Sequence, residues 1–233
     1  MDFLSADEWA VVALSLKVSG VAIMLVLPVS FAIAWVLERT RLPGKVFLDA
    51  LVHLPLVLPP VVTGWGLLLL FGNNGPAGRF LADMLGITLM FRWTGAALAA
   101  GVMALPLMVR AIRLSLEGID QRFEVAARTL GANRWKTFRS ITLPLAMPGV
   151  LAALVLGFAR SIGEFGATIT FVSNVPEETR TLPLAIYTAL QVPGGESTVT
   201  RLALVSIALS LAALVASEWL VRRGRQGESG HVL

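Results

Sequence analysis

Cysteine is absent from this sequence, and charge is scarce. The 233 residues contain no cysteine, and Asp, Glu, Lys and Arg together make up only 15%. Soluble domains carry about 25% charged residues, so this chain has too little charge to cover a water-facing surface. The lack of cysteine also excludes disulfides, thiolate metal sites and cysteine nucleophiles. A soluble enzyme, a disordered segment and a nucleic-acid-binding domain are all disfavoured, and a single membrane domain over residues 1–233 is expected.

Motifs for catalysis and nucleotide binding are missing as well. The sequence has no G-x-x-x-x-G-K-[ST] phosphate-binding loop, no H-E-x-x-H and no G-x-S-x-G. The run GNNGPAG at 72–78 resembles a phosphate loop only in its glycine content. An intramembrane hydrolase would have to use Ser161 or Glu164, and the sequence contains no suitably placed base for either residue. We therefore expect a chain that is not an enzyme and binds no cofactor of its own.

What the sequence does contain is long apolar stretches. Hydrophobic residues make up 56% of the chain, and a membrane-crossing helix needs roughly 17–25 mostly apolar residues. The acidic start, with Asp2, Asp7 and Glu8, is the reverse of a cleaved signal peptide. The segment Thr181–Gln191 is too short to cross and is expected to lie in or on the outer leaflet. Five stretches are predicted spans: Val18–Leu37, Ala50–Gly78, Trp93–Val109, Ser140–Ala159 and Leu202–Ser217. The prediction is an all-α integral membrane bundle of about five transmembrane helices.

The basic residues predict the orientation of this bundle. Thirteen of the 19 Lys and Arg residues fall between the first and second spans, between the third and fourth, or after the fifth. Only four fall on the alternate faces. Since cytoplasmic loops carry the excess of Lys and Arg, the N-terminus is predicted outside. The C-terminus, with a basic tail at 222–233, is predicted in the cytoplasm.

The predicted cytoplasmic loop after the third span has a specific pattern. Phe123, Ala126, Ala127 and Leu130 follow helical spacing and form a small apolar stripe. Gly131 is a natural helix stop, and Asn133 can cap a second helix that carries Trp135 and Phe138. The residues alone leave two interpretations open: a basic hairpin resting on anionic lipid headgroups, or a docking element for a cytoplasmic partner.

The spacing Ala126-Ala127, Gly131, Ile141 and Leu143-Pro144 resembles the EAA loop of bacterial ABC importer permeases. In that family the loop forms a coupling helix seated in a cleft of the ATP-hydrolysing subunit. The family glutamate position holds Val125 here, with Glu124 one residue earlier. The resemblance implies a coupling loop over about 114–143, with these ATPase-coupling residues: Glu124, Val125, Ala126, Ala127, Leu130, Gly131, Trp135, Ile141, Leu143 and Pro144.

A wider resemblance points to one branch of this family. The stretches HLPLVLPPVVTG (53–64), PLMVRAIRLSLEGID (106–120), FARSIGEFGATITFVSN (158–174), PEETRTLPLAIYT (176–188) and PGGES (193–197) are similar to the permeases of molybdate importers. This resemblance implies a type I importer fold and import of an oxyanion, with molybdate favoured. Sulfate and tungstate permeases share a stretch like Gly163–Thr168 and remain alternatives.

The same resemblance implies a set of partners in the bacterial inner membrane. It predicts a homodimer of this chain, two cytoplasmic ABC ATPase subunits that bind the ATP, and a periplasmic or extracellular oxyanion-binding protein. Membrane lipid is an expected partner, and nucleic acid is not.

Charged and hydroxyl side chains inside the predicted spans are candidates for the translocation path. Arg160 and Glu164 are four residues apart and are predicted to share one face of the fourth span. They form either a self-neutralising pair that fixes the helix or a pair that shapes a gate. Thr168 and Thr170, on the outer half of the same predicted helix, and Thr63 are candidate pore-lining residues. His53, alone among aliphatic residues, is interpreted as a helix-packing residue.

Two rival functions belong to other classes. A gradient-driven secondary transporter would show inverted repeats with broken helices at matching positions, and we find no such duplication. A membrane scaffold that only recruits a cytoplasmic protein would explain the loop but not the charges within the spans. An importer permease is the function that the sequence favours.

Overall fold

The computed structural model describes the backbone of residues 3–229 and the side chains of residues 3–216. Within these residues the chain is helical, with no strand. The predicted basic tail at 222–233 lies outside the described side chains. The elements in chain order are α1 (Ala6–Arg39), α2 (Lys45–Val57), α3 (Pro60–Phe71), α4 (Pro76–Leu85), α5 (Trp93–Glu117), α6 (Gln121–Thr129), α7 (Arg134–Thr137), the π-helix η1 (Phe138–Thr142), α8 (Leu143–Ile162), α9 (Gly166–Val172), α10 (Leu182–Leu190) and α11 (Glu196–Ser229).

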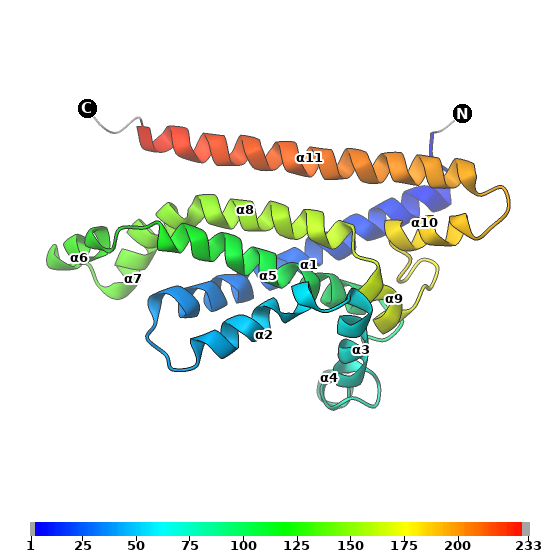
Figure 1. Ribbon diagram of the computed structural model, residues 1–233, viewed down its shortest axis with the longest axis horizontal. Helices are drawn as coiled ribbons and strands as arrows, with labels where there is room; N and C mark the ends of the chain where they lie inside the picture. The colour runs from blue at the N-terminus through cyan, green and yellow to red at the C-terminus, as the bar shows by residue number, and fades with distance from the viewer. Residues whose placement is uncertain (1–2, 230–233) are drawn as a thin grey trace.

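The long helices α1, α5, α8 and α11 run lengthwise through the molecule (Figure 1). By length and composition, four helical stretches could cross a membrane, and the bent pair of α2 and α3 could supply a fifth. The α6–α7 segment lies at one end of the bundle and α10 at the other. α1 begins at the α10 end, whereas α11 ends near the α6–α7 end (Figure 1). The prediction of about five spans in an all-helical bundle is confirmed.

The first predicted span is one continuous helix. α1 begins with a capping box in which the Ser5 hydroxyl accepts a hydrogen bond from the Glu8 amide and the Glu8 carboxylate accepts one from the Ser5 amide. The helix then continues through Pro28 as far as Arg39. The turn to α2 uses Gly44, whose φ of 83° lies in the left-handed region that glycine tolerates.

The second predicted span, Ala50–Gly78, is broken. α2 and α3 meet at an angle of 117°. Pro59 and Pro60 provide no amide hydrogen, and each disfavours helical geometry in the preceding residue, so Leu58 and Pro59 both have extended ψ angles. α3 and α4 therefore point away from the lengthwise helices (Figure 1).

The core of the bundle is packed by α1, α5 and α8. Small residues allow close approach: a Cβ on Gly157 would lie 2.7 Å from the Met108 Sδ and 2.9 Å from the Ile23 Cδ1. Ala34, Ala104 and Ala153 are fully buried at the same contacts. Helix packing in lipid relies on such small residues, because apolar burial alone gives little advantage there. α11 packs on α8 but exposes most of its own surface, as a lipid-facing helix would.

Candidate functional site

The predicted break in the loop is present at Gly131. α6 starts behind Asp120, whose Oδ1 accepts a hydrogen bond from the Arg122 amide at 2.9 Å. It ends at Leu130, and Gly131 adopts a φ of 86°. The Ala132 amide then donates to the Ala127 carbonyl at 3.0 Å, which closes the helix end. The glycine stop inferred from the sequence is confirmed.

Asn133 starts the second helix, also as predicted. Its Oδ1 accepts a hydrogen bond from the Lys136 amide at 2.8 Å. α7 passes without interruption into η1 and α8, so the fourth predicted span belongs to a helical stretch that runs from Arg134 to Ile162. Pro144 has no amide hydrogen to close a normal α-turn, and the turn before it is wide, with the Leu143 amide bonded to the Phe138 carbonyl. The two helices of the loop therefore join the bundle through a π-helical segment.

Most of the apolar side chains of this loop face outward. Leu130 is 88% exposed and Trp135 is 69% exposed. Phe123, Val125, Ala126 and Pro144 are also exposed, while Ala127, Ile141 and Leu143 are half-buried. Phe123, Ile141 and Pro144 line a shallow apolar hollow of about 270 Å³ together with neighbours from η1 and α8. The predicted coupling residues of α6 and η1 thus come together, and their own chain leaves them uncovered.

Glu124 is the exception, because it points inward. Its carboxylate lies 3.4 Å from an Arg39 nitrogen and accepts a hydrogen bond from the Thr142 hydroxyl at 2.9 Å. Arg39 also donates to the Leu116 carbonyl at 3.2 Å. The adjacent Val125 is 52% exposed. Glu124 therefore ties α6 to the end of α1 and to η1. Sequence reasoning missed Arg39 and Thr142, because nothing in a single sequence pairs them with α6.

An aromatic cluster reinforces the same connection. The Phe138 ring lies 5.4 Å from Trp35 and 5.9 Å from Phe31, both edge-on, and Trp135 stacks on Phe138 at 5.7 Å between centroids. Edge-to-face aromatic pairs contribute about 0.5–1.5 kcal/mol each beyond their buried area. Packed rings therefore connect α7 and η1 to α1, beside the Glu124 contacts that connect α6 to α1.

The pair Arg160–Glu164 exists, but not on one helix. An Arg160 guanidinium nitrogen lies 2.7 Å from a Glu164 carboxylate oxygen, and the Glu164 side chain is only 2% exposed. α8 ends at Ile162, so Glu164 lies in the break before α9. Its other oxygen accepts a hydrogen bond from the Ala167 amide of α9 at 2.8 Å. Glu164 thus joins the last turn of α8 to the first turn of α9, and each of its carboxylate oxygens has a partner.

The threonine candidates differ from the sequence expectation. Thr168 and Thr170 are not on the outer half of α8, because Gly163–Phe165 ends that helix and both residues belong to α9. Thr168 is 2% exposed, and the Thr170 hydroxyl donates to the Gly166 carbonyl of its own helix. The Thr63 hydroxyl is buried and has no hydrogen-bond partner among the described residues. All three lie around the contact between α3 and α9.

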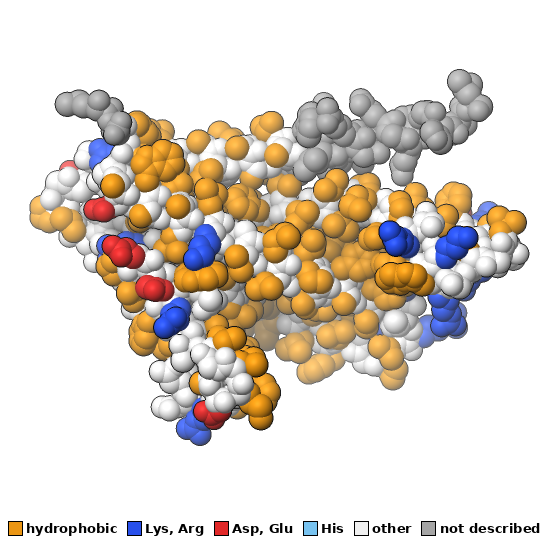
Figure 2. Space-filling model, turned by 180° about the vertical axis from the view of Figure 1, so that it is seen from behind, with side chains coloured by type: hydrophobic (Ala, Val, Ile, Leu, Met, Phe, Trp, Pro, Cys, Tyr) orange, Lys and Arg blue, Asp and Glu red, His pale blue; other side chains and the backbone are white. Residues whose placement is uncertain are grey.

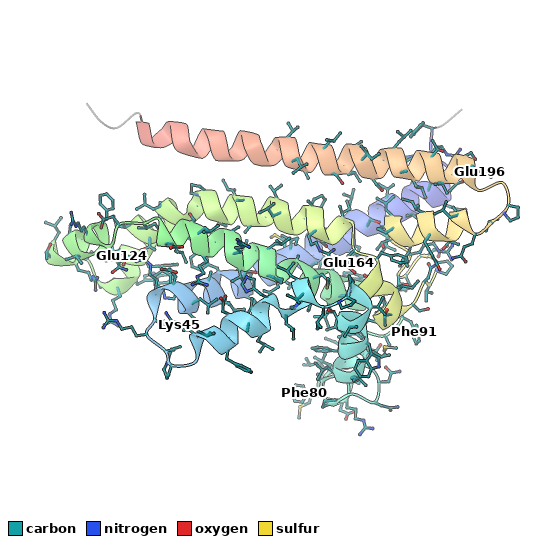
Figure 3. The ribbon with its side chains drawn as sticks, viewed as in Figure 1. Lys45, Phe80, Phe91, Glu124, Glu164 and Glu196 are labelled. Carbon is teal, nitrogen blue, oxygen red and sulfur yellow. The ribbon has the colours of Figure 1, made fainter. Side chains whose placement is uncertain are left out.

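That contact brings the two helix breaks together. A Cβ on Gly166 would lie 2.8 Å from the Pro60 Cβ, and one on Gly64 would lie 2.6 Å from the Ala167 carbonyl oxygen. The N-terminal halves of α3 and α9 therefore approach closely, with glycine on one side of each of these contacts. Glu164 lies here, far along the bundle from Glu124 (Figure 3). In the sequence, only the two glycines of the stretch GEFGAT and the prolines of the second span pointed to these helix breaks.

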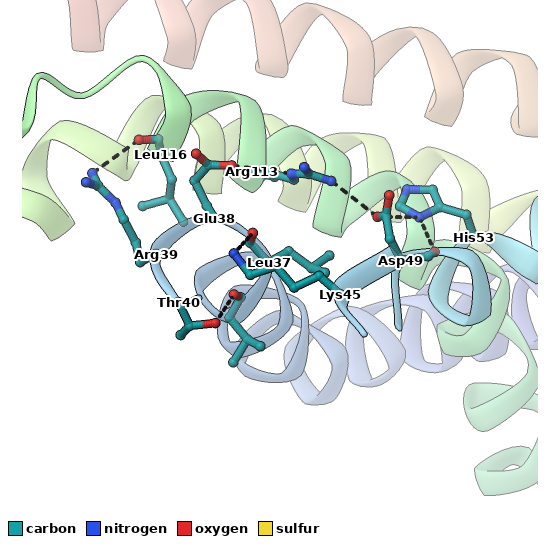
Figure 4. A network of polar contacts seen from close by, with 10 residues as sticks. Leu37, Glu38, Arg39, Thr40, Lys45, Asp49, His53, Arg113 and Leu116 are labelled. Atoms are coloured by element: carbon teal, nitrogen blue, oxygen red, sulfur yellow. Dashed lines mark hydrogen bonds and ion pairs between the residues drawn. The ribbon is translucent and has the colours of Figure 1, made fainter. Parts of the chain in front are cut away.

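A second polar network lies near the loop end of the bundle. Arg113 contacts Glu38 at 3.4 Å and Asp49 at 3.3 Å, which connects α5 to both α1 and α2 (Figure 4). The His53 Nδ1 lies 2.9 Å from the Asp49 carbonyl oxygen. Lys45 donates to the Leu37 carbonyl at 2.8 Å across the turn. His53 thus contacts Asp49 of its own helix, and its role as a helix-packing residue stays a prediction.

At the opposite end, a bidentate pair holds α11 to α1. Arg201 donates to both Glu8 oxygens, at 2.7 and 3.1 Å, and the Glu8 side chain is 6% exposed. Further along α1, the Lys17 ammonium lies 3.8 Å from the centre of the Trp93 ring. Neither contact was predicted, since the partners are distant in the sequence.

A comparison with known families now decides what kind of protein has this architecture. Residues 26–226 match the family model of the binding-protein-dependent transport system inner membrane component. The chain belongs to this family. It is therefore an inner membrane component of an ABC transport system, in agreement with its apolar helices.

Individual members of this family are similar along nearly the whole chain. The molybdenum transport system permease protein ModB of Escherichia coli K12 is 58% identical over 223 residues, covering 96% of this chain and 97% of that protein. ModB of Haemophilus influenzae is 53% identical, covering 93% and 94%. The sulfate transport system permease protein CysT of E. coli K12 is 41% identical over 68% of this chain and 57% of its own length.

Solved structures support the fold. A bacterial ABC transporter involved in the import of the acidic polysaccharide alginate matches with a TM-score of 0.70 at 18% identity, covering 96% of this chain and 81% of that one. The MetNI methionine ABC transporter in an inward-facing conformation matches with a TM-score of 0.67 at 17% identity, covering 93% and 94%. The predicted type I importer permease fold is confirmed.

Proposed function

We propose that this chain is the membrane permease of a molybdate importer. The observation that carries the proposal is the similarity to ModB proteins over almost the full length of both chains. Sulfate is the second candidate, because CysT proteins match at lower identity and over a smaller share of the chain. Tungstate has no similar support among these relatives.

The chain acts in this proposal as a passive conduit without catalytic activity. Two copies form the pathway, two ATPase subunits bind and hydrolyse ATP, and a separate binding protein delivers the oxyanion to the outer mouth. The chain has no phosphate-binding loop of its own. Co-purification of a stoichiometric ATPase, with uptake that stops when ATP is removed, separates this mechanism from a gradient-driven transporter.

The α6–α7 end is the proposed docking site for the ATPase. Lys and Arg side chains gather at this end of the molecule, and no Asp or Glu is visible there on the face drawn in Figure 2. The other end of that face carries both signs. The excess of basic residues supports a cytoplasmic position for α6 and α7. α1 begins and α11 ends at opposite ends of the bundle, which fits an N-terminus outside and a C-terminus inside.

Coupling follows from the contacts of α6 and α7. When the ATPase pair closes on ATP, the exposed side chains of α6 and α7 move with it. Glu124 and the ring of Phe138 pass this displacement to α1, and η1 passes it to α8. ATP can shift the bundle between an inward-facing and an outward-facing state only if these contacts differ between the two states. At the far end of α8, Glu164 joins α8 to α9, which packs against α3, and this joint is the proposed gate.

The decisive experiment measures ATP hydrolysis. The chain is reconstituted with its ATPase and the cognate binding protein, and molybdate, sulfate and tungstate are added in turn. Stimulation of ATP hydrolysis by molybdate alone supports the proposal, whereas stimulation by sulfate alone would make sulfate the transported anion. Labelling of the α6–α7 segment from the outer side of the membrane would contradict the proposed topology.

A further inference from the structure

A polar pocket of about 330 Å³ lies between the last turn of α1, α6 and α7. Three arginines line it, one from each of these elements: Arg39, Arg128 and Arg134. The carboxylate that lines it is that of Glu124. The lining therefore carries three positive charges against one negative charge.

The single carboxylate is already neutralised within the wall. Glu124 receives the Arg39 ion pair and the Thr142 hydrogen bond. Arg128 uses its Nε on the Glu124 main-chain carbonyl at 3.2 Å. Its terminal nitrogens, and the whole guanidinium of Arg134, make no hydrogen bond or ion pair with any side chain that the structure describes. Two arginine forks thus face the pocket without a counter-charge.

The rest of the lining consists of the polar residues Gln121, Thr137 and Thr142 and two aromatic residues. Trp35 and Phe138 line the pocket beside the arginines. Tryptophan near the end of a membrane helix favours the level of the lipid headgroups. An arginine fork matches the geometry of a phosphate, which it can bind through two parallel hydrogen bonds. Basic pockets between helices on the cytoplasmic side are suited to anionic lipid headgroups.

From this arrangement we infer that the pocket binds the phosphate of an anionic phospholipid from the inner leaflet. Arg128 and Arg134 hold the phosphate, and the aromatic wall packs on the glycerol and the start of the acyl chains. The lipid then bridges α6 and α7 at the end of α1 and sets the resting position of the coupling loop. The assignment to the inner leaflet rests on the proposed function, because it requires the α6–α7 end to be cytoplasmic.

The test measures lipid binding to the full chain by native mass spectrometry in detergent. Phosphatidylglycerol is titrated against phosphatidylcholine, with inorganic phosphate in a separate arm. The pocket variant is Arg128→Gln with Arg134→Gln. The matched control is Arg122→Gln with Arg139→Gln, which removes two exposed arginines of the same segment that do not line the pocket.

We expect phosphatidylglycerol to bind the native chain and the control pair with equal affinity, and the pocket pair about tenfold more weakly or worse. A tenfold loss corresponds to about 1.4 kcal/mol of binding free energy, and it is expected because glutamine cannot make the charge-assisted hydrogen bonds of an arginine fork. Equal weakening of both pairs would overturn the inference, since it would indicate only diffuse attraction to basic residues. Binding of inorganic phosphate in place of the lipid would overturn it as well.

Two further arms keep the result interpretable. If the glutamine pair does not fold, Arg128→Lys with Arg134→Lys keeps both charges but removes the forks, and a several-fold loss of phosphatidylglycerol binding is expected. Docking of the ATPase is measured separately on the same variants. If the native chain docks the ATPase but does not prefer phosphatidylglycerol, the inference is wrong and the proposed function stands. If the native chain binds phosphatidylglycerol but does not dock the ATPase, only the proposed function is contradicted.

Discussion

The two polar joints of this chain, around Glu124 and around Glu164, are built in opposite ways. Glu124 lies beneath a surface of exposed apolar side chains, of which Leu130 and Trp135 are the most exposed. Glu164 is enclosed, and both of its oxygens are used by Arg160 and by the α9 backbone. The chain leaves the apolar surface over Glu124 exposed, whereas it buries Glu164. The difference fits the proposals that a partner covers the loop and that the helix break is the gate.

The largest effect is expected at the enclosed joint. Arg160→Ala leaves a Glu164 carboxylate buried without its counter-charge, which costs about 3–5 kcal/mol when one partner of a buried pair is removed. We expect poor assembly, a lowered thermal midpoint in detergent and no uptake. Arg160→Lys keeps the charge and serves as the control. Normal uptake by Arg160→Ala would show that the pair is not needed to hold α8 and α9 together.

The open region predicts the reverse pattern, with stability kept and docking lost. Leu130→Asp changes a side chain that is 88% exposed in the free chain, so folding should be unaffected. In the complex the carboxylate would be buried, and a central interface residue is worth about 2–4 kcal/mol. ATPase binding should weaken by about 30-fold or more in a pull-down or in interferometry. Val192→Asp, at an exposed apolar residue after α10, is the matched control; equal docking by both variants would refute the role of Leu130.

A third variant tests whether the enclosed joint depends on the contact between the two helix breaks. Gly166→Ala would push a methyl group to 2.8 Å from the Pro60 Cβ, and overpacking typically costs about 1–3 kcal/mol. We expect reduced uptake with ATPase docking unchanged. Gly163→Ala is the control for adding a methyl group in the same break, because its Cβ would come no closer than 3.8 Å to the Ala159 carbonyl oxygen. Similar uptake by both variants would argue against close α3–α9 contact.

The same contrast explains what the sequence could predict. Gly131 and Asn133 were identified because helix stops and caps depend on local chemistry, and both act as predicted. The position of Glu164 was predicted wrongly, because a helical spacing of four was extended through a break that the flanking glycines make possible. Pro55, Pro59 and Pro60 of the second span disfavour a regular helix, but they do not predict the 117° bend, which also depends on the packing of α3 against α9.

Long-range partners were out of reach of a single sequence. Arg39 and Thr142 meet Glu124 only when α1, α6 and η1 are assembled. Likewise, Arg201 reaches Glu8 from the other end of the chain. Composition and charge predicted the class of fold and the loop that carries the motif. The contacts that would transmit a movement from that loop required the structure.

The smallest effect is expected from strain in the open region alone. A Cβ on Gly131 would meet no atom within 4 Å, so Gly131→Ala introduces no steric clash. It tests only the backbone strain of a side-chain-bearing residue at a φ of 86°, which costs about 1–2 kcal/mol. Gly20→Ala is the matched control, since its Cβ also has free space but its backbone is helical, where alanine is favoured by about 1 kcal/mol. Gly131→Ala should weaken docking several-fold at an unchanged thermal midpoint, because the strain tilts α6 relative to α7 without disturbing the bundle. Gly20→Ala should leave docking intact and raise the midpoint slightly. If Gly131→Ala lowered the midpoint as much as Arg160→Ala does, the loop would be part of the folded core, and the division between an open and an enclosed joint would fail.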